Sequence, residues 1–84
     1  MKIDYYCTNK VFLHPVKAMQ TYLRYISRHI PEISNVVPDG IYDKITAESV
    51  SSFQRYFGLR ETGIIDYPTW EMIVFVYQQL QKSN

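Results

Sequence analysis

Apolar residues recur at helical spacing in the first half of the chain. They are Val16, Met19, Leu23, Ile26 and Ile30. Intervals of three and four residues place them on one face of a helix. The pair His14-Pro15 suits the start of this helix, because the missing N–H of proline would be unpaired in the first turn anyway. Pro31 is expected to end the helix, and residues 32–38 to form an irregular connection.

A second helix is expected to begin near Asp43 or Lys44 and to stop at Gly58. Its apolar face holds Ala47, Val50, Phe53 and Phe57. A third helix is expected from Tyr67-Pro68 to about Gln81, again with proline in the first turn. Together the three helices predict an all-α fold, a compact three-helix bundle over residues 15–84.

The third helix is apolar nearly all round. Its main apolar face holds Trp70, Ile73, Val74 and Tyr77, and its other sides hold Met72, Phe75 and Val76. Such a helix needs cover on more than one side. Residues 1–14 are expected to form an ordered N-terminal arm that supplies this cover, with Phe12 meeting Phe75. The alternative is an exposed patch for a partner, including self-association through this helix.

The composition fits one small globular domain. The chain has 84 residues, of which 46% are apolar and 20% charged. Its formal net charge of +1 disfavours nucleic-acid binding, which depends on neutralising phosphates. Cys7 is the only cysteine, so neither an internal disulfide nor a zinc site is expected. The chain shows no secretory signal pattern and no stretch apolar enough to span a membrane.

A short internal repeat is the most informative local feature. Residues 39–46 and 62–69 both carry the pattern G-I-x-D-x-x-T, at an offset of 23 residues, and both precede a predicted helix. The glycine permits a positive φ, and the isoleucine after it is expected to fill the core. Asp43 and Asp66 are expected to accept hydrogen bonds from free N–H groups of the first helical turn. Each copy therefore predicts a rigid joint between a loop and a helix.

Several short motifs surround this repeat in a fixed order. They are Val16-x-x-Met19-Gln20-x-x-Leu23, Asp39-Gly40-Ile41-Tyr42, Thr46, Val50-x-x-Phe53-Gln54, Gly58-Leu59, Thr62-Gly63-Ile64 and Thr69-Trp70. In order and spacing, the set resembles the peptidoglycan-binding domain of bacterial cell-wall hydrolases over residues 16 to about 74. The resemblance implies a three-helix domain without catalytic residues. Such domains are usually appended to an amidase, peptidase or muramidase and hold the enzyme on the wall.

The chain departs from the family pattern after each Gly-Ile pair. Where the family typically has Gly-Pro, this chain has Asp43-Lys44 and Asp66-Tyr67. The aspartate caps keep the helix starts despite these changes. The departures motivate an alternative function, in which a protein–protein interaction or self-assembly domain keeps the fold but has exchanged the wall ligand.

Peptidoglycan offers sugar faces, amides, hydroxyls and free carboxylates, which aromatic rings, hydrogen-bonding side chains and cations recognise. The candidate ligand-binding residues are Asp39, Tyr42, Gln54, Arg55 and Tyr56. Structural alternatives remain open for three of them. Tyr42 is alternatively a half-buried ring that packs its loop, Gln54 an anchor for the neighbouring loop backbone, and Asp39 a nucleus of its turn.

Three basic residues follow one face of the first helix, opposite its apolar stripe. Lys17, Arg24 and Arg28 lie within about 40° of one another around the helix axis. This basic line is a candidate contact for anionic wall polymers, and the alternative is the solvated face of an amphipathic helix. Tyr22 and Tyr25 flank it and are expected to stay half exposed, as part of a binding face.

No residue is assigned a catalytic role. A thiol pair of Cys7 with His14 or His29 lacks any supporting motif, and no phosphate-binding glycine-rich loop is present. Neither a cofactor nor a metal ion is expected. The resemblance implies a noncatalytic module that targets an associated hydrolase or wall protein to peptidoglycan. Such a module would work at the cell wall or outside the cell, within a larger exported protein.

Overall fold

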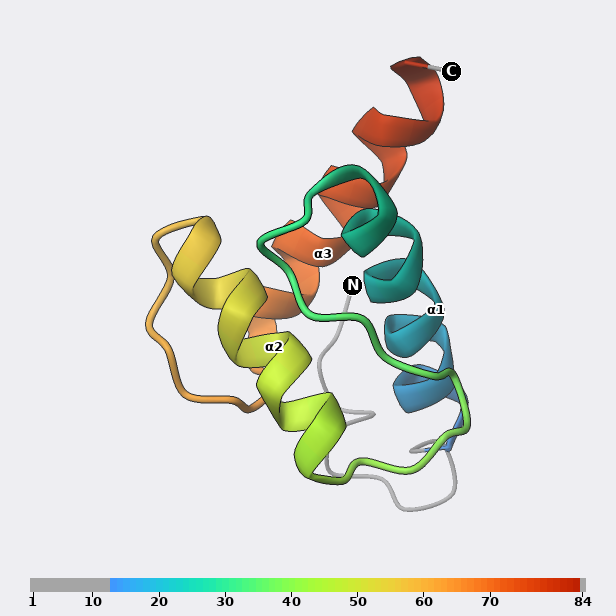
Figure 1. Cartoon of the computed structure of the whole chain (residues 1–84), viewed down its shortest axis with the longest axis vertical. Coiled ribbons are helices and arrows are strands. Elements are labelled where there is room, and N and C mark those ends of the chain that lie inside the picture. Colours follow the sequence, from blue (N-terminus) through green and yellow to red (C-terminus); the bar gives the residue numbers. More distant parts are fainter. Residues whose placement is uncertain (1–12, 84) are drawn as a thin grey trace.

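The computed structural model describes residues 13–83, which fold into three helices (Figure 1). Helix α1 spans Leu13–His29, α2 spans Lys44–Tyr56 and α3 spans Tyr67–Ser83. The described part of the chain holds no β-strand. The all-α three-helix fold is therefore confirmed. Residues 1–12 of the expected N-terminal arm, with Cys7 and Phe12, lie outside the described range and stay a prediction, whereas its last two residues belong to α1.

Side-chain caps start α2 and α3 as the repeated pattern predicts. The Asp43 carboxylate accepts a hydrogen bond from the Thr46 N–H at 3.1 Å, and Asp66 accepts one from the Thr69 N–H at 3.1 Å. The loop before each cap contains a tight turn with a glycine at positive φ, 80° at Gly40 and 74° at Gly63. We call residues 39–42 the first turn and residues 62–65 the second turn.

The hydrophobic core lies between the three helices. Its buried members are Met19, Leu23, Ile26, Ile33, Val36, Val50, Phe53, Ile73 and Val76. The apolar stripe of α1 is thus confirmed as a core face, and Phe53 of α2 is fully buried. Helix α1 packs mainly along α3, and the C-terminal end of α3 extends beyond the rest of the domain (Figure 1).

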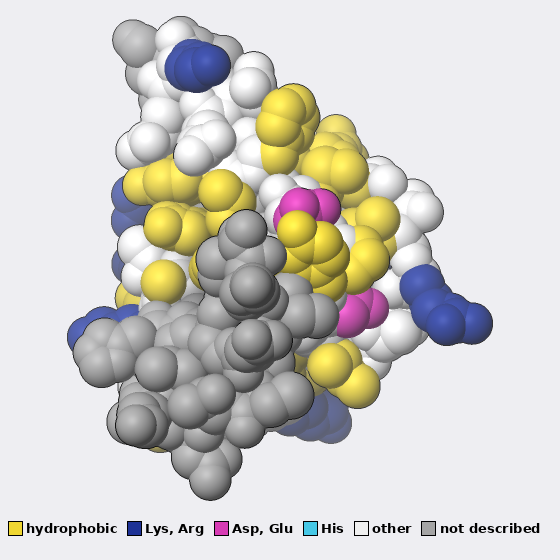
Figure 2. Space-filling model, turned by 180° about the vertical axis from the view of Figure 1, so that it is seen from behind, with side chains coloured by type: hydrophobic (Ala, Val, Ile, Leu, Met, Phe, Trp, Pro, Cys, Tyr) yellow, Lys and Arg dark blue, Asp and Glu magenta, His cyan; other side chains and the backbone are white. Residues whose placement is uncertain are grey.

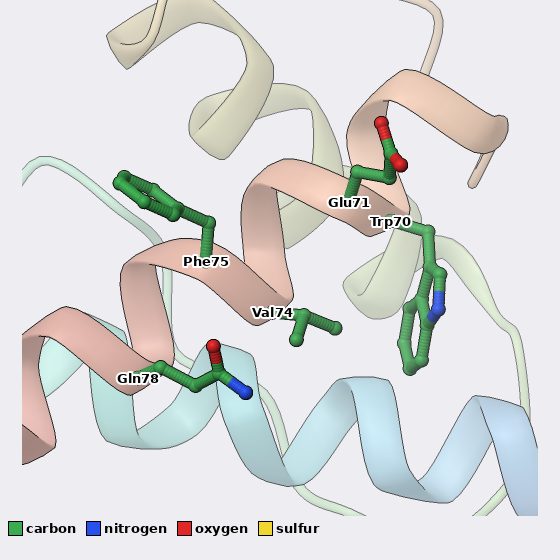
Figure 3. Close-up of a pocket in the computed structure, with 5 residues that line it drawn as sticks. All are labelled: Trp70, Glu71, Val74, Phe75 and Gln78. Atoms are coloured by element: carbon green, nitrogen blue, oxygen red, sulfur yellow. The ribbon is translucent and has the colours of Figure 1, made fainter. Parts of the chain in front are cut away.

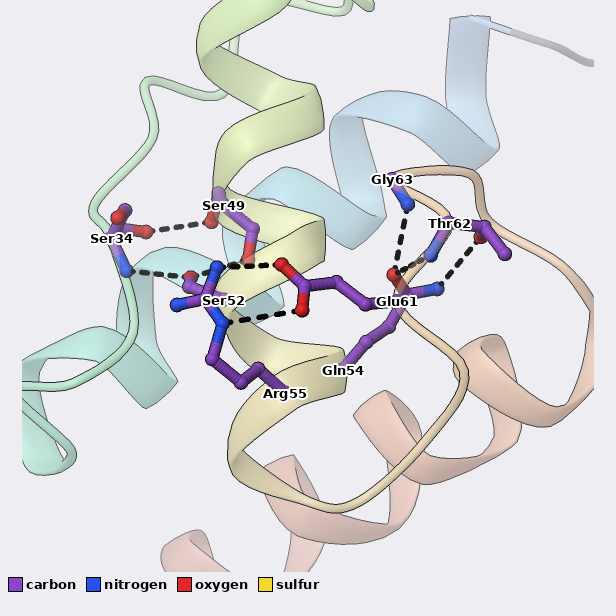
Figure 4. A network of polar contacts seen from close by, with 8 residues as sticks. All are labelled: Ser34, Ser49, Ser52, Gln54, Arg55, Glu61, Thr62 and Gly63. Carbon is purple, nitrogen blue, oxygen red and sulfur yellow. Dashed lines mark hydrogen bonds and ion pairs between the residues drawn. The ribbon is translucent and has the colours of Figure 1, made fainter.

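The connection between α1 and α2 also contributes to the core. Ile33 and Val36 are buried there, although the segment has no helical or strand period. Serine side chains of α2 fix its backbone: Ser49 Oγ donates to the Ser34 carbonyl at 2.6 Å, and the Ser34 N–H donates to Ser52 Oγ at 2.9 Å (Figure 4). The connection is irregular in shape but firmly held.

Aromatic rings form the contact between α1 and α3. Tyr22 stacks on Tyr77 with ring centroids 4.3 Å apart and lies 6.0 Å from the Trp70 ring. Tyr25 meets Tyr77 edge-on at 5.2 Å. Both residues are partly buried, in line with the half-exposed state expected from the sequence, and their rings pack against the neighbouring helix. A part for them in ligand binding stays a prediction.

No helix among the described residues is long and apolar enough to cross a membrane.

Candidate ligand-binding surface

The buried Gln20 of α1 holds the first turn. Its Nε2 group donates to the Ile41 carbonyl and to Thr46 Oγ1, both at 2.9 Å. Its Oε1 atom accepts a hydrogen bond from the Gly40 N–H at 2.8 Å, and Nε2 also lies 3.2 Å from Asp39 Oδ1. One amide therefore fixes the turn backbone and the start of the following helix together.

Gln54 of α2 holds the second turn with the same atoms. Its Nε2 group donates to the Ile64 carbonyl at 3.1 Å and to Thr69 Oγ1 at 2.9 Å. Its Oε1 atom accepts from the Thr62 and Gly63 N–H groups, each at 2.9 Å (Figure 4). The Gln54 side chain is fully buried. Its contacts are those of an anchor for the neighbouring loop backbone, which is one of the two roles that the sequence left open.

The two glutamines are structurally equivalent. Each lies on the helix before a turn, binds the turn's Gly N–H and Ile carbonyl, and reaches the threonine of the next helix. The role of Gln20 was missed from sequence. A signal was present, because Val16-x-x-Met19-Gln20 recurs as Val50-x-x-Phe53-Gln54 at an offset of 34 residues.

Tyr42 connects the two turns. Its hydroxyl donates a hydrogen bond to the Gly63 carbonyl at 2.5 Å, while 39% of the residue stays exposed. Burial of the hydroxyl end, together with the negative charge of Asp66, raises the pKa of Tyr42 to about 12. The hydroxyl is therefore neutral and able to donate at physiological pH. We call the first and second turns, linked in this way, the joined turns.

The isoleucines of the joined turns face solvent. Ile41 is 59% exposed and Ile64 is 64% exposed. The expectation that these side chains fill the core is wrong, because the amides of Gln20 and Gln54 occupy the inner side of each turn. Ile45, the second residue of α2, is likewise exposed. The joined turns thus present apolar side chains on a backbone fixed from beneath.

Asp39 lies at the exposed edge of the first turn. Its Oδ1 atom accepts a hydrogen bond from the Ile41 N–H at 2.9 Å, which is the main cause that lowers the pKa of Asp39, with the Gln20 amide adding to it. The carboxylate therefore stays ionised near neutral pH. The turn-forming role considered from sequence is present in the structure, and the side chain is also accessible.

Arg55 and Tyr56 lie at the end of α2 with exposed side chains. Arg55 makes a bidentate contact with Glu61, with Nη2 to Oε2 at 2.6 Å and Nε to Oε1 at 3.3 Å (Figure 4). This pairing raises the pKa of Arg55 and lowers that of Glu61. The Tyr56 ring packs edge-on against Phe57, with ring centroids 5.0 Å apart. A ligand carboxylate would therefore compete with Glu61 for the guanidinium.

The basic line stays on the outer side of α1. Lys17 and Arg28 are exposed, and Arg24 is partly buried. Residues 13–83 contain no cluster of three or more His, Cys, Asp or Glu side chains placed to hold a metal ion.

One of the comparisons with known proteins gives a match, and it agrees with the fold. The family model for the peptidoglycan binding domain matches residues 14–73, a range that includes both glutamines and the joined turns. This range is well over half of the 84-residue chain. No curated protein and no solved structure gives a significant match.

Proposed function

Because this chain belongs to the peptidoglycan binding domain family, we propose that it binds peptidoglycan and does so through the joined turns. The observation that supports this surface is the exposure of Ile41, Tyr42 and Ile64 on turns that Gln20 and Gln54 hold rigidly. A fixed backbone loses little conformational entropy on binding. Exposed apolar side chains on such a backbone favour a recognition role.

The side chains of the joined turns match the chemistry of the polymer. The isoleucines and the Tyr42 ring suit sugar faces and the methyl groups of N-acetyl and peptide units. Asp39 suits an amide or hydroxyl donor. Arg55 suits a stem-peptide carboxylate in exchange for Glu61.

Three further features contribute to the proposed binding. Tyr56, 48% exposed, offers a second aromatic face beside Arg55. Gln54 acts indirectly, since its buried amide positions the second turn. The basic line of Lys17, Arg24 and Arg28 adds a salt-dependent attraction for anionic wall groups.

The proposed role is noncatalytic. A module of this kind would hold an associated hydrolase or wall protein on peptidoglycan, at the cell wall or outside the cell. The small size of the domain and the structural use of its buried polar side chains support a binding module more than an enzyme.

Co-sedimentation with purified, insoluble peptidoglycan tests the proposal. The folded chain is expected to pellet with the polymer at low salt, and added soluble peptidoglycan fragments are expected to release it. Folding is checked by circular dichroism in the same buffer. A folded chain that stays in the supernatant at low salt would contradict wall binding.

An alternative function is a protein–protein interaction or self-assembly domain. The observation that favours it is that Phe75 of α3 is 56% exposed. This residue does not belong to the joined turns. Sedimentation velocity over a wide range of protein concentrations tests self-assembly. A monomer at every concentration would exclude association through α3.

A further inference from the structure

A shallow apolar hollow runs along the outer side of α3. It has a volume of about 430 Å³, and Trp70, Glu71, Val74, Phe75 and Gln78 line it (Figure 3). The space-filling view from behind shows hydrophobic side chains gathered on this face of the molecule (Figure 2). Trp70 also packs against the core, whose buried α3 members are Ile73 and Val76, whereas Val74 and Phe75 do not belong to the core cluster. The hollow thus borders the core at Trp70 and is lined by no residue of the joined turns.

Helix α1 contacts Trp70, a residue that lines the hollow, through Tyr22. Tyr22 contacts both Trp70 and Tyr77, whereas the later Tyr25 contacts Tyr77. Helices α1 and α3 thus run in the same general direction, as Figure 1 also shows. The start of α1 consequently lies on the Trp70 side of the contact. Residues 1–12 therefore join the described chain on the Trp70 side of α3.

We propose that residues 1–12 of this chain dock in the α3 hollow and cover Trp70, Val74 and Phe75. Twelve residues in extended form reach about 40 Å, whereas the lining residues from Trp70 to Gln78 cover about 12 Å of the helix axis. The inference is independent of the proposed wall ligand, because it concerns a different face of the domain.

The chemistry of residues 1–12 fits the hollow. The apolar side chains available there include Ile3, Tyr5, Tyr6, Val11 and Phe12. The segment also carries Lys2 and Lys10 against the single acid Asp4. Among the described residues that line the hollow, Glu71 is charged, and its sign is opposite to the excess charge of the segment. Docking would bury apolar surface on both sides and place a lysine near this carboxylate.

The chain carries its own probes for this contact. Trp70 is the only tryptophan, and Cys7 is the only cysteine. A nitroxide attached to Cys7 quenches tryptophan fluorescence only at short range. The full chain is labelled with the nitroxide, and a second sample carries the diamagnetic analogue of the same label. Trp70 emission is expected to be several-fold weaker in the nitroxide sample and independent of protein concentration.

Matched variants connect the quenching with the hollow. Phe75→Glu is expected to restore most of the Trp70 emission, and Glu71→Lys, an exposed charge reversal, is expected to restore part of it at low salt. Tyr56→Glu, at an exposed aromatic residue outside the hollow, is expected to leave the quenching unchanged. Circular dichroism verifies that each variant keeps its helices.

Two results would overturn the proposal. Equal Trp70 emission from the nitroxide and diamagnetic samples would mean that residues 1–12 do not contact the hollow. Quenching that grows with protein concentration would assign the hollow to a second copy of the chain.

Discussion

The Tyr42 hydroxyl donates a hydrogen bond to the carbonyl of Gly63, a residue 21 positions further along the chain. This bond joins the two copies of the repeated turn directly. A buried glutamine holds each copy through hydrogen bonds, Gln20 at the first turn and Gln54 at the second. The repeat therefore builds one continuous, fixed surface instead of two independent joints.

Removing this hydroxyl is expected to weaken the domain modestly. Tyr42→Phe keeps the ring but leaves the Gly63 carbonyl without this donor, which costs about 1 kcal/mol of the free energy of unfolding. Urea denaturation followed by circular dichroism measures the change. An unchanged midpoint and slope would mean that the bond contributes nothing to stability in solution.

The same bond predicts a dependence on alkaline pH. The pKa of Tyr42 is raised to about 12 in the folded chain, against about 10 for an ordinary tyrosine. Between these values the unfolded chain loses this proton while the folded chain keeps it, so the free energy of unfolding falls as pH rises. Tyr42→Phe is expected to show a shallower fall over this range. The free energy of unfolding is measured by urea denaturation at a series of pH values. Parallel curves of this free energy against pH for the two proteins would contradict the raised pKa of Tyr42.

Two glycines with similar φ provide a matched test of packing at the second turn. Gly58 has φ +71° with open space where a Cβ would lie, whereas a Cβ at Gly63 would lie 3.1 Å from Ser51 Oγ. Gly58→Ala is expected to cost about 1–2 kcal/mol from backbone strain alone. Gly63→Ala is expected to cost more, and adding Ser51→Ala should recover part of the excess. Equal losses at both glycines in thermal melts would refute the crowding argument.

The buried Gln54 side chain is expected to contribute more to the free energy of unfolding than an exposed glutamine does. Gln54→Met fills a similar volume but leaves the buried Gly63 N–H without its acceptor, at a cost of about 2–3 kcal/mol. Gln81→Met, at an exposed position of α3, is the control and should change stability by less than about 0.5 kcal/mol. Similar losses of stability from both variants in urea denaturation would contradict a stabilising role of the Gln54 hydrogen bonds.

Local features of the sequence predicted the helices and their caps. The Asp43 and Asp66 caps and the positive φ of Gly40 and Gly63 follow from interactions within a few residues. The direction of the isoleucine side chains did not follow, because a turn has no period that distinguishes its inner from its outer side.

Contacts between distant segments were also beyond the sequence pattern. Ile33 and Val36 join the core from an irregular connection whose path depends on the packed helices. The contact of Tyr42 with Gly63 depends on how α2 places the two turns side by side. Stacking of Tyr22 on Tyr77 likewise depends on how α1 lies along α3.

The central claim is that the joined turns contact peptidoglycan. The most direct test is the binding isotherm of the full chain on insoluble peptidoglycan, measured by co-sedimentation for three folded proteins. These are the unmodified chain, the double variant Ile41→Ser with Ile64→Ser, and the control Phe75→Ser, which removes a similarly exposed apolar side chain from α3. We predict that the double variant loses most of its binding while the control binds like the unmodified chain. Full binding by the double variant would contradict the claim.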